Sequence, residues 1–216
     1  VEELNGGFFY NFGKNVTSVT IPNSVKNIGY DTFRDWTNLS QVTLGDSLET
    51  IGTAAFQGCT ALESIVIPNS VTSFARDVFS NCSNLASVTL SNSLKTIGEG
   101  SFRECTRLDS IIIPNSVTTI EDRVFEGCTK LSYITLGDSL KTIGDWAFNG
   151  CNSLNTVNIP KVDILFNDYS FAHEGNPFSK ASTLHVNGKE VTELVIPDGV
   201  EEIRGGFFYN FGKNVT

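Results

Sequence analysis

The chain has 216 residues, of which 40% are hydrophobic and 18% are charged, and this composition is typical of one folded domain of up to about 250 residues. Its net charge of −9 opposes the attraction to phosphate groups that supplies most non-specific affinity for nucleic acids, so we expect no nucleic-acid partner. No apolar run approaches the roughly 18 residues that span a bilayer, so we expect no membrane insertion in this part of the protein.

The first 17 residues recur almost unchanged at the end of the chain. They read VEELNGGFFYNFGKNVT, and residues 200–216 read VEEIRGGFFYNFGKNVT. We interpret 1–17 as a partial N-terminal repeat and 194–216 as a partial C-terminal repeat. The pattern predicts a piece of a tandem array of such modules, or a chain built to mimic one. We expect head-to-tail self-association, because neither end has a polar capping repeat and both would expose ladder edges.

Residues 18–155 repeat every 23 residues, which predicts six regular units of a repeat architecture. A phenylalanine, a leucine and a cysteine column share this step, with Trp36 in the place of the first cysteine. The columns are Phe33, Phe56, Phe79, Phe102, Phe125 and Phe148; Leu39, Leu62, Leu85, Leu108, Leu131 and Leu154; and Cys59, Cys82, Cys105, Cys128 and Cys151. A second period of 46 residues alternates Pro22, Pro68, Pro114 and Pro160 with Gly45, Ser91 and Gly137, which suggests duplication of unit pairs.

Each unit opens with alternating apolar residues, as in Ser18-Val19-Thr20-Ile21, and proline or glycine then stops the run. This pattern predicts a short strand with Val19 and Ile21 facing inward. A second extended piece follows, as in Val25 to Ile28, and then a tight segment around the phenylalanine and cysteine that we expect to form one helical turn. One unit cannot bury its own apolar residues, so stacked units with parallel strands about 4.8 Å apart are expected.

Residues 156–193 break the period and are interpreted as an irregular repeat or insertion. Their aromatic residues are expected to pack onto the solenoid, and Asn187-Gly188 predicts a hairpin turn. The repeat is then expected to return as a strand at Leu194-Val195-Ile196-Pro197. The aromatic and histidine residues concerned are Phe166, Tyr169, Phe171, His173 and Phe178.

The consensus Val-Thr-Ile-Pro-Asn-Ser-Val-x-x-Ile-Gly-x-x-x-Phe-x-x-Cys-x-x-Leu resembles the BspA-like subclass of leucine-rich repeats over nearly the whole chain. The irregular part is also similar, with Asn176-Pro177 and an Asn-Gly turn before a returning repeat. The resemblance implies a single leucine-rich-repeat solenoid, with parallel β ladders and short helical or irregular turns. It also implies a surface protein of bacteria or protozoa, of a family in which some members are adhesins. The chain departs from the family at Trp36 and at 207–213, where cysteine is absent.

The cysteines and histidines are the candidates for chemistry. A column of cysteines on one side of successive units does not converge on a tetrahedral metal site, and parallel side chains suit a disulfide poorly, so we predict buried free thiols. His173 and His185 stand in no recognisable pattern with a nucleophile and a carboxylate. We therefore predict no enzyme activity, no metal and no cofactor.

The outward side chains of the predicted strands form two nearly uncharged columns, which we interpret as the candidate ligand-binding face. A solvated face on which threonine is merely a good strand residue is the other interpretation. The candidate binding residues are Gln41, Thr43, Val66, Thr89, Ile112, Tyr133 and Thr135.

Taken together, the sequence predicts a non-catalytic, adhesin-like binding module, extracellular or at the cell surface. Its expected ligand is a protein of the host matrix or a cell surface, or a glycan. The alternative hypothesis is a structural spacer, or a tandem repeat array that stacks head to tail.

Overall fold

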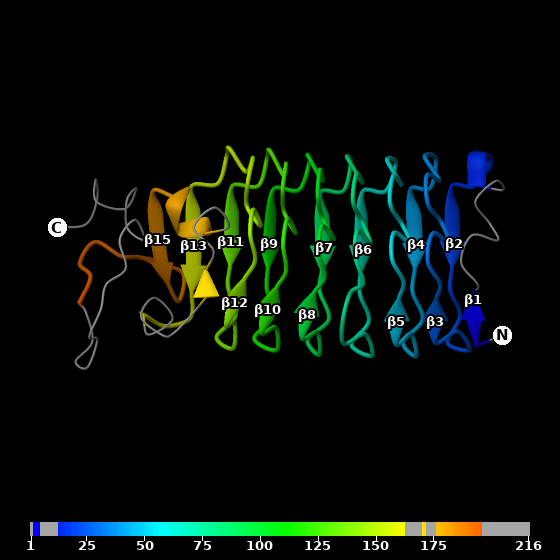
Figure 1. The fold of residues 1–216 in the computed structure, drawn as a ribbon, viewed down its shortest axis with the longest axis horizontal. Helices are drawn as coiled ribbons and strands as arrows, with labels where there is room; N and C mark the ends of the chain where they lie inside the picture. Colours follow the sequence, from blue (N-terminus) through cyan, green and yellow to red (C-terminus); the bar gives the residue numbers. More distant parts are fainter. Residues whose placement is uncertain (1, 5–12, 163–169, 172–175, 196–216) are drawn as a thin grey trace.

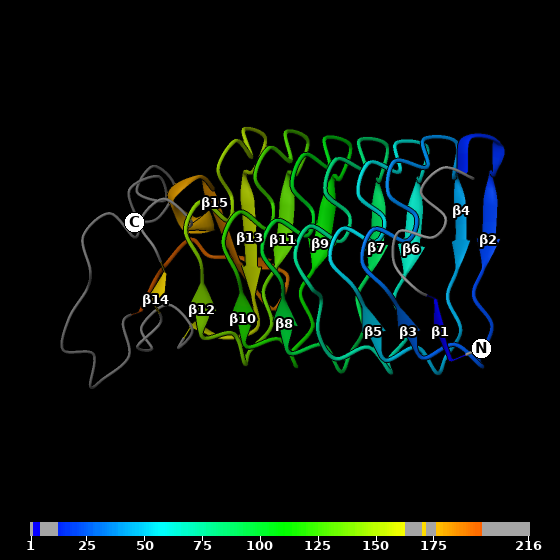
Figure 2. The same cartoon turned by 45° about the vertical axis from the view of Figure 1, so that its right-hand side comes forward.

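The computed structural model describes residues 2–4, 13–162, 170–171 and 176–195. They form a solenoid in which each unit of 23 residues makes one turn, and the predicted leucine-rich-repeat fold is confirmed. Two rows of parallel strands run along the molecule, as Figures 1 and 2 show. No helix of the described residues is long and apolar enough to cross a membrane.

The first row consists of the strands that open the units. Ser18 lies opposite Gln41, and Tyr133 lies opposite Thr156, so equivalent residues of neighbouring units are in register. The strands are β2 (Ser18–Thr20), β4 (Gln41–Thr43), β6 (Ser64–Val66), β7 (Ser87–Thr89), β9 (Ser110–Ile112), β11 (Tyr133–Thr135), β13 (Thr156–Ile159) and β15 (Thr183–Val186).

The second row contains the second extended pieces, which are shorter than predicted. Their inward isoleucines are aligned, and Phe74 takes the isoleucine place in the third unit through single bridges from Ile51 to Phe74 and from Ser73 to Thr96. The strands are β1 (Glu3–Leu4), β3 (Asn27–Ile28), β5 (Thr50–Ile51), β8 (Thr96–Ile97), β10 (Thr119–Ile120), β12 (Thr142–Ile143) and β14 (Ser170–Phe171).

The third side of each unit, here called the turn side, carries the phenylalanine and cysteine columns. The helical turn predicted there is wrong: in the described units this side is a series of turns. Alternate amides on this side bond to the next unit, as in Phe56 N–H to the Val78 carbonyl at 2.9 Å, and those between them bond three residues back, as in Cys59 N–H to the Phe56 carbonyl at 3.2 Å. Stacked neighbours therefore satisfy the polar backbone that a helix would have satisfied internally. The described 3₁₀ helices, η1 (Gly13–Asn15) and η3 (Pro177–Ser179), take the equivalent place only outside the six regular units, before β2 and in the irregular stretch.

The core is one continuous cluster between the three sides. The phenylalanine rings from Phe33 to Phe148 stack at centroid distances of 5.1–5.7 Å between neighbouring units. At the N-terminal end the Trp36 ring fills the cysteine position, and Gly13 precedes it by one unit. A Cβ atom on Gly13 would collide with the Trp36 ring, so the glycine makes room for the larger side chain.

The irregular stretch forms a longer turn of the same solenoid. Its β15 pairs in parallel with β13, and Phe178 is buried in the core, as the sequence predicted for this aromatic residue. The predicted Asn187-Gly188 hairpin is confirmed: β15 pairs antiparallel with β16 (Lys189–Glu190), and both turn residues have positive φ. Phe166, Tyr169 and His173, and the side chain of Phe171, lie outside the described residues.

In the described residues, β16 covers the outer edge of β15, whereas the open ladder edge expected at the C-terminal end of the chain involves residues that lie outside the described ones. The antiparallel β16 occupies the edge of β15 and presents the exposed charged side chains of Lys189 and Glu190. A short charged edge strand of this kind blocks further pairing. Leu194 and Val195 are not in a strand, and the remainder of the strand predicted at 194–197 lies outside the described residues.

Candidate ligand-binding face

The strand face, defined as the outward side chains of the first row, is built as the sequence predicted. Parallel register places equivalent residues side by side, so the seven candidate residues fall into two adjacent columns. One column holds Ser18, Gln41, Ser64, Ser87, Ser110, Tyr133, Thr156 and Thr183; the other holds Thr20, Thr43, Val66, Thr89, Ile112, Thr135, Asn158 and His185.

The candidates differ in their exposure. Gln41, Thr43 and Thr89 are exposed, and two branched apolar side chains also stand in solvent, Val66 at 64% and Ile112 at 67% exposure. Exposed apolar side chains on an otherwise polar surface lose contact with water when a partner covers them, which favours binding. The strand face thus presents two exposed apolar side chains, Val66 and Ile112, among mostly serine and threonine hydroxyl groups.

Tyr133 and Thr135 are half-buried because residues of the irregular stretch pack against them. The His185 ring meets the Tyr133 ring edge to face, with centroids 6.2 Å apart. Asn158 lies between their strands, donates to the Thr135 hydroxyl at 3.4 Å and accepts the Gly188 N–H at 2.9 Å. Sequence reasoning treated His185 as a possible catalytic residue and missed its place on this face. The Asn187-Gly188 turn could have revealed this position, because it predicts a strand just before it, and His185 lies in that strand.

No Asp, Glu, Lys or Arg belongs to either column of the strand face. The turn side carries exposed ion pairs, such as Arg76 with Glu99 at 3.1 Å and Arg76 with Asp77 at 3.2 Å. Exposed pairs of this kind contribute little to stability, typically about 0–1 kcal/mol. Their effect is to keep the turn side hydrated, in contrast to the uncharged columns of the strand face.

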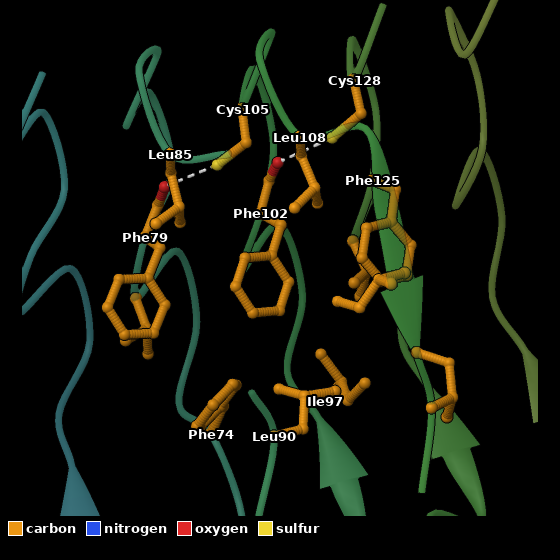
Figure 3. Close-up of a cluster of buried hydrophobic side chains, with 14 of the residues drawn as sticks. Phe74, Phe79, Leu85, Leu90, Ile97, Phe102, Cys105, Leu108, Phe125 and Cys128 are labelled. Carbon is orange, nitrogen blue, oxygen red and sulfur yellow. Dashed lines mark hydrogen bonds between the residues drawn. The ribbon is translucent and has the colours of Figure 1, made fainter. Parts of the chain in front are cut away.

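The five cysteines form the predicted buried column of free thiols. Each sulfur donates to the backbone carbonyl of the phenylalanine in the preceding unit, and Figure 3 shows two such bonds, from Cys105 to Phe79 and from Cys128 to Phe102, at 3.2 and 3.1 Å. Burial raises the pKa of Cys59 and of Cys151 to about 12, against a smaller opposing effect of backbone hydrogen bonding. Burial likewise raises the pKa of the three inner thiols well above the ordinary value. These groups are structural thiols, since the reactive species is the thiolate.

We expect a thiol reagent to leave the native protein unlabelled and to modify five thiols after unfolding, because the cysteines are buried and held in the protonated form. Mass spectrometry after timed exposure to the reagent checks this. Ser87→Cys, on the exposed strand face, is the matched control and should label at once. Cys105→Ser should lower stability and leave the labelling of the other four unchanged. Rapid labelling of the native wild type, or a disulfide-linked peptide, would contradict the buried column.

The structure brings no catalytic group together around the candidate histidine. In the described part of the chain, the one aromatic contact of His185 is with Tyr133, and no cluster of three His, Cys, Asp or Glu residues has the geometry to hold a metal. His173 lies outside the described residues. The arrangement on this face can therefore offer hydroxyl, amide and apolar contacts to a ligand.

Comparison with protein families places these features in a known group. The model of the BspA type leucine rich repeat region, with six copies, matches residues 2–121 and 95–216. The chain belongs to the BspA-type leucine-rich repeat family. Comparison of this BspA-type protein with curated proteins gave no match.

Solved structures show the same fold. The leucine-rich repeat protein of T. pallidum is 29% identical, with a TM-score of 0.64 over 66% of this chain and 72% of its own. A leucine-rich cell surface protein of Faecalibacterium prausnitzii A2-165 is 24% identical, with a TM-score of 0.52 over 93% and 72%. A leucine-rich repeat protein of Bacteroides ovatus is 24% identical, with a TM-score of 0.51 over 89% of this chain but 58% of its own length. The BspA-type protein thus shares its repeat geometry with bacterial leucine-rich repeat proteins.

Proposed function

We propose that this BspA-type protein is a non-catalytic binding module of an extracellular or cell-surface protein, and that its strand face holds a protein ligand. The observation that carries the proposal is the strand face itself: two uncharged columns in register, with Val66 and Ile112 exposed at 64% and 67%. A surface location is supported by the family and by the similarity to the leucine-rich cell surface protein of Faecalibacterium prausnitzii.

A protein is favoured over a glycan because the two exposed side chains are aliphatic. Val66 and Ile112 offer methyl groups, which are stabilised by burial against apolar side chains at about 25 cal/mol per Å² of apolar surface. The surrounding serine and threonine hydroxyls supply the polar rim that protein interfaces use around such anchors. A host matrix or cell-surface protein is the partner class we propose, and a glycan is the other outcome of a binding screen.

We expect Thr89→Lys and Tyr133→Ala to weaken binding at least about tenfold, because each removes or disturbs contacts near the centre of the strand face, where anchors matter most. Binding to an array of matrix proteins and glycans is first measured by surface plasmon resonance with the wild type, and the variants are then tested on each positive. The thermal melt of Thr89→Lys should stay within about 2 °C of the wild type, since changes at exposed residues seldom exceed ±0.5 kcal/mol. Tyr133→Ala should melt lower, because the half-buried ring also packs against His185, so its loss of binding is interpreted together with that of Thr89→Lys.

Thr72→Lys is the matched control for Thr89→Lys. Thr72 is also an exposed threonine one unit away, but it lies beside the second row, so the same charge is added outside the strand face. The control should bind like the wild type. Equal loss in both variants would indicate a general charge effect, and survival of binding in Thr89→Lys and Tyr133→Ala would move the site away from this face.

Head-to-tail self-association is the second candidate function, and the near-identity of residues 1–17 and 200–216 is the observation that favours it. The covered edge at β16 weighs against continuation of the first row at that end. Light scattering across a range of protein concentrations separates the two functions. A constant monomer mass favours the binding module, and growth in mass with concentration favours self-association.

A further inference from the structure

The first row is divided into two pairs of strands and one longer group, here called blocks. Within a block, backbone hydrogen bonds join neighbouring strands at both of their ends. In the pair of β2 and β4, Gln41 N–H donates to the Thr17 carbonyl and Ile21 N–H donates to the Thr43 carbonyl. The pair of β6 and β7 repeats these bonds, through Ser87 N–H to Glu63 and Ile67 N–H to Thr89. The ladder therefore separates into β2–β4, β6–β7 and a longer group that starts with β9.

Two seams lie between these blocks, one between β4 and β6 and one between β7 and β9. The amides at the equivalent places, Leu44 and Ser64 at the first seam and Leu90 and Ser110 at the second, donate no backbone bond in the described residues. Figure 1 shows the strands on either side of each seam farther apart than the strands within a block.

The turn side is closed across the same two seams. Phe56 N–H donates to the Val78 carbonyl across the first seam, and Phe102 N–H donates to the Val124 carbonyl across the second, both at 2.9 Å. These bonds match the in-block bond from Phe79 N–H to Ser101 at 2.8 Å. The blocks are therefore parted on the strand face while they remain joined at the phenylalanine and cysteine columns.

Side chains at the turn after each strand follow the same division. Within blocks an asparagine side chain accepts the backbone amide of the next unit, as in Asp46 N–H to Asn23 and Asn92 N–H to Asn69, both at 2.8 Å. Across the seams a serine hydroxyl donates to a leucine carbonyl instead, from Ser70 to Leu48 and from Ser116 to Leu94. The 46-residue sequence period thus has a structural counterpart.

A third boundary of the same sequence type, between β11 and β13, keeps its backbone hydrogen bond and can be compared with the seams. Pro160 follows β13 as Pro68 follows β6, yet Leu136 N–H donates to Asn158 at 2.9 Å across this boundary. Proline alone therefore does not open the ladder. One difference lies on the strand face, where Asn158 occupies the place of Val66 and Ile112 and donates its side-chain amide to the Thr135 hydroxyl. A branched aliphatic side chain has no such donor.

We propose that the strand face is jointed at these two seams, so that its strands part there in the folded protein while the turn side and the second row stay closed. The joints coincide with the two exposed apolar residues, since Val66 lies on β6 and Ile112 on β9. The proposal concerns the conformation of the chain and does not depend on the proposed function.

Amide hydrogen exchange of the folded full chain, followed by NMR, tests this. The amides of Leu44 and Leu90 should exchange at least about 100-fold faster than those of Ile67 and Ile113, whereas the amides of Phe56 and Phe102 should be as slow as that of Phe79. Equal protection of Leu44, Leu90, Ile67 and Ile113 would overturn the seams. Fast exchange at Phe56 and Phe102 would overturn the closed turn side.

Two exchanges of side chain test the cause. Ile112→Asn should slow exchange at Leu90 by about tenfold or more, and Asn158→Val should speed exchange at Leu136 by a similar factor, because the cross-strand amide is gained or lost. Thr20→Asn, in the same column but away from both seams, is the control and should leave Leu44 and Leu90 unchanged. If the exchange rates at Leu90 and Leu136 are unchanged in these variants, the side chains at 112 and 158 do not determine whether the strands part.

Discussion

Replacing Phe102 by alanine is expected to lower the free energy of unfolding by about 3–5 kcal/mol. The Phe102 ring is fully buried and stacks between Phe79 and Phe125 at 5.6 and 5.7 Å, while Phe74 meets its edge at 6.0 Å. Its loss removes contacts in three units at once and leaves a cavity that stacked backbones on either side cannot collapse. Urea or guanidinium melts of the two proteins measure the difference.

Val66→Ala is the matched control for this change, because it also truncates an apolar side chain but one that is 64% exposed. Its effect should stay within about 0.5 kcal/mol. A loss below about 1 kcal/mol for Phe102→Ala would show that the phenylalanine column is not the core of the solenoid.

Alkaline pH should unfold the protein steeply, and the thiol column is the reason. A cysteine thiol in the unfolded chain ionises near pH 8.5, whereas burial raises the pKa of Cys59 and Cys151 in the folded chain to about 12. The folded state therefore holds protons that the unfolded state releases, so stability is unaffected below about pH 8.5 and falls as the pH rises toward the folded pKa.

The size of this effect follows from proton linkage. Each thiol that ionises only on unfolding lowers stability by about 1.4 kcal/mol per pH unit above its unfolded pKa. With five thiols acting together the slope approaches about 7 kcal/mol per pH unit, comparable with the whole stability of a typical domain. Urea midpoints measured from pH 7 to pH 10 check the slope, and Cys105→Ala should reduce it by about one fifth. A midpoint that stays constant up to pH 10 would show that these thiols do not ionise on unfolding.

The repeat itself was predictable because its signal is redundant. Phenylalanine and cysteine recur at the same step in unit after unit, so the buried columns and the register of the strand face could be derived before any coordinates. Periodicity also assigned Gln41, Val66 and Tyr133 to one outer face. Periodicity does not show where neighbouring strands part, because Val66 and Ile112 belong to the same column as Asn158. The parting depends on the side chain at that position, including its hydrogen-bonding capacity, and not on the period.

The backbone of the turn side was not predictable for a different reason. Two positions in every unit adopt the left-handed conformation, but glycine occupies only some of them. For other residues this conformation costs about 1–2 kcal/mol, so a sequence pattern does not predict it at an alanine, an arginine or a tryptophan. The two columns are Asp31, Ala54, Asp77, Gly100, Arg123 and Trp146, and Asp35, Gly58, Asn81, Glu104, Gly127 and Gly150.

Contacts between units hold these residues in place. Arg123 donates its amide to the Asp145 carbonyl at 2.9 Å, and its guanidinium lies over the ring of Trp146, the next residue of the column, at 5.3 Å. A helical turn, the conformation expected from the local sequence, would have left these bonds between units unmade. Contacts between stacked units therefore outweigh the local conformational preference, and these contacts cannot be predicted from the sequence of one unit.

The directional thiol bond and the two-strand blocks together determine how such a chain can change its length. Every cysteine depends on the phenylalanine carbonyl one unit earlier, and the turn chemistry alternates between proline units and glycine or serine units. Excision of residues 64–109 would join Glu63 to Ser110, which puts one proline unit in the place of another. Cys128 would then donate to the Phe56 carbonyl in place of the excised Phe102, so every remaining thiol would have an equivalent acceptor. Excision of one unit would instead set two units of the same kind side by side. Recombination can therefore lengthen or shorten this solenoid in steps of two units without new contact chemistry.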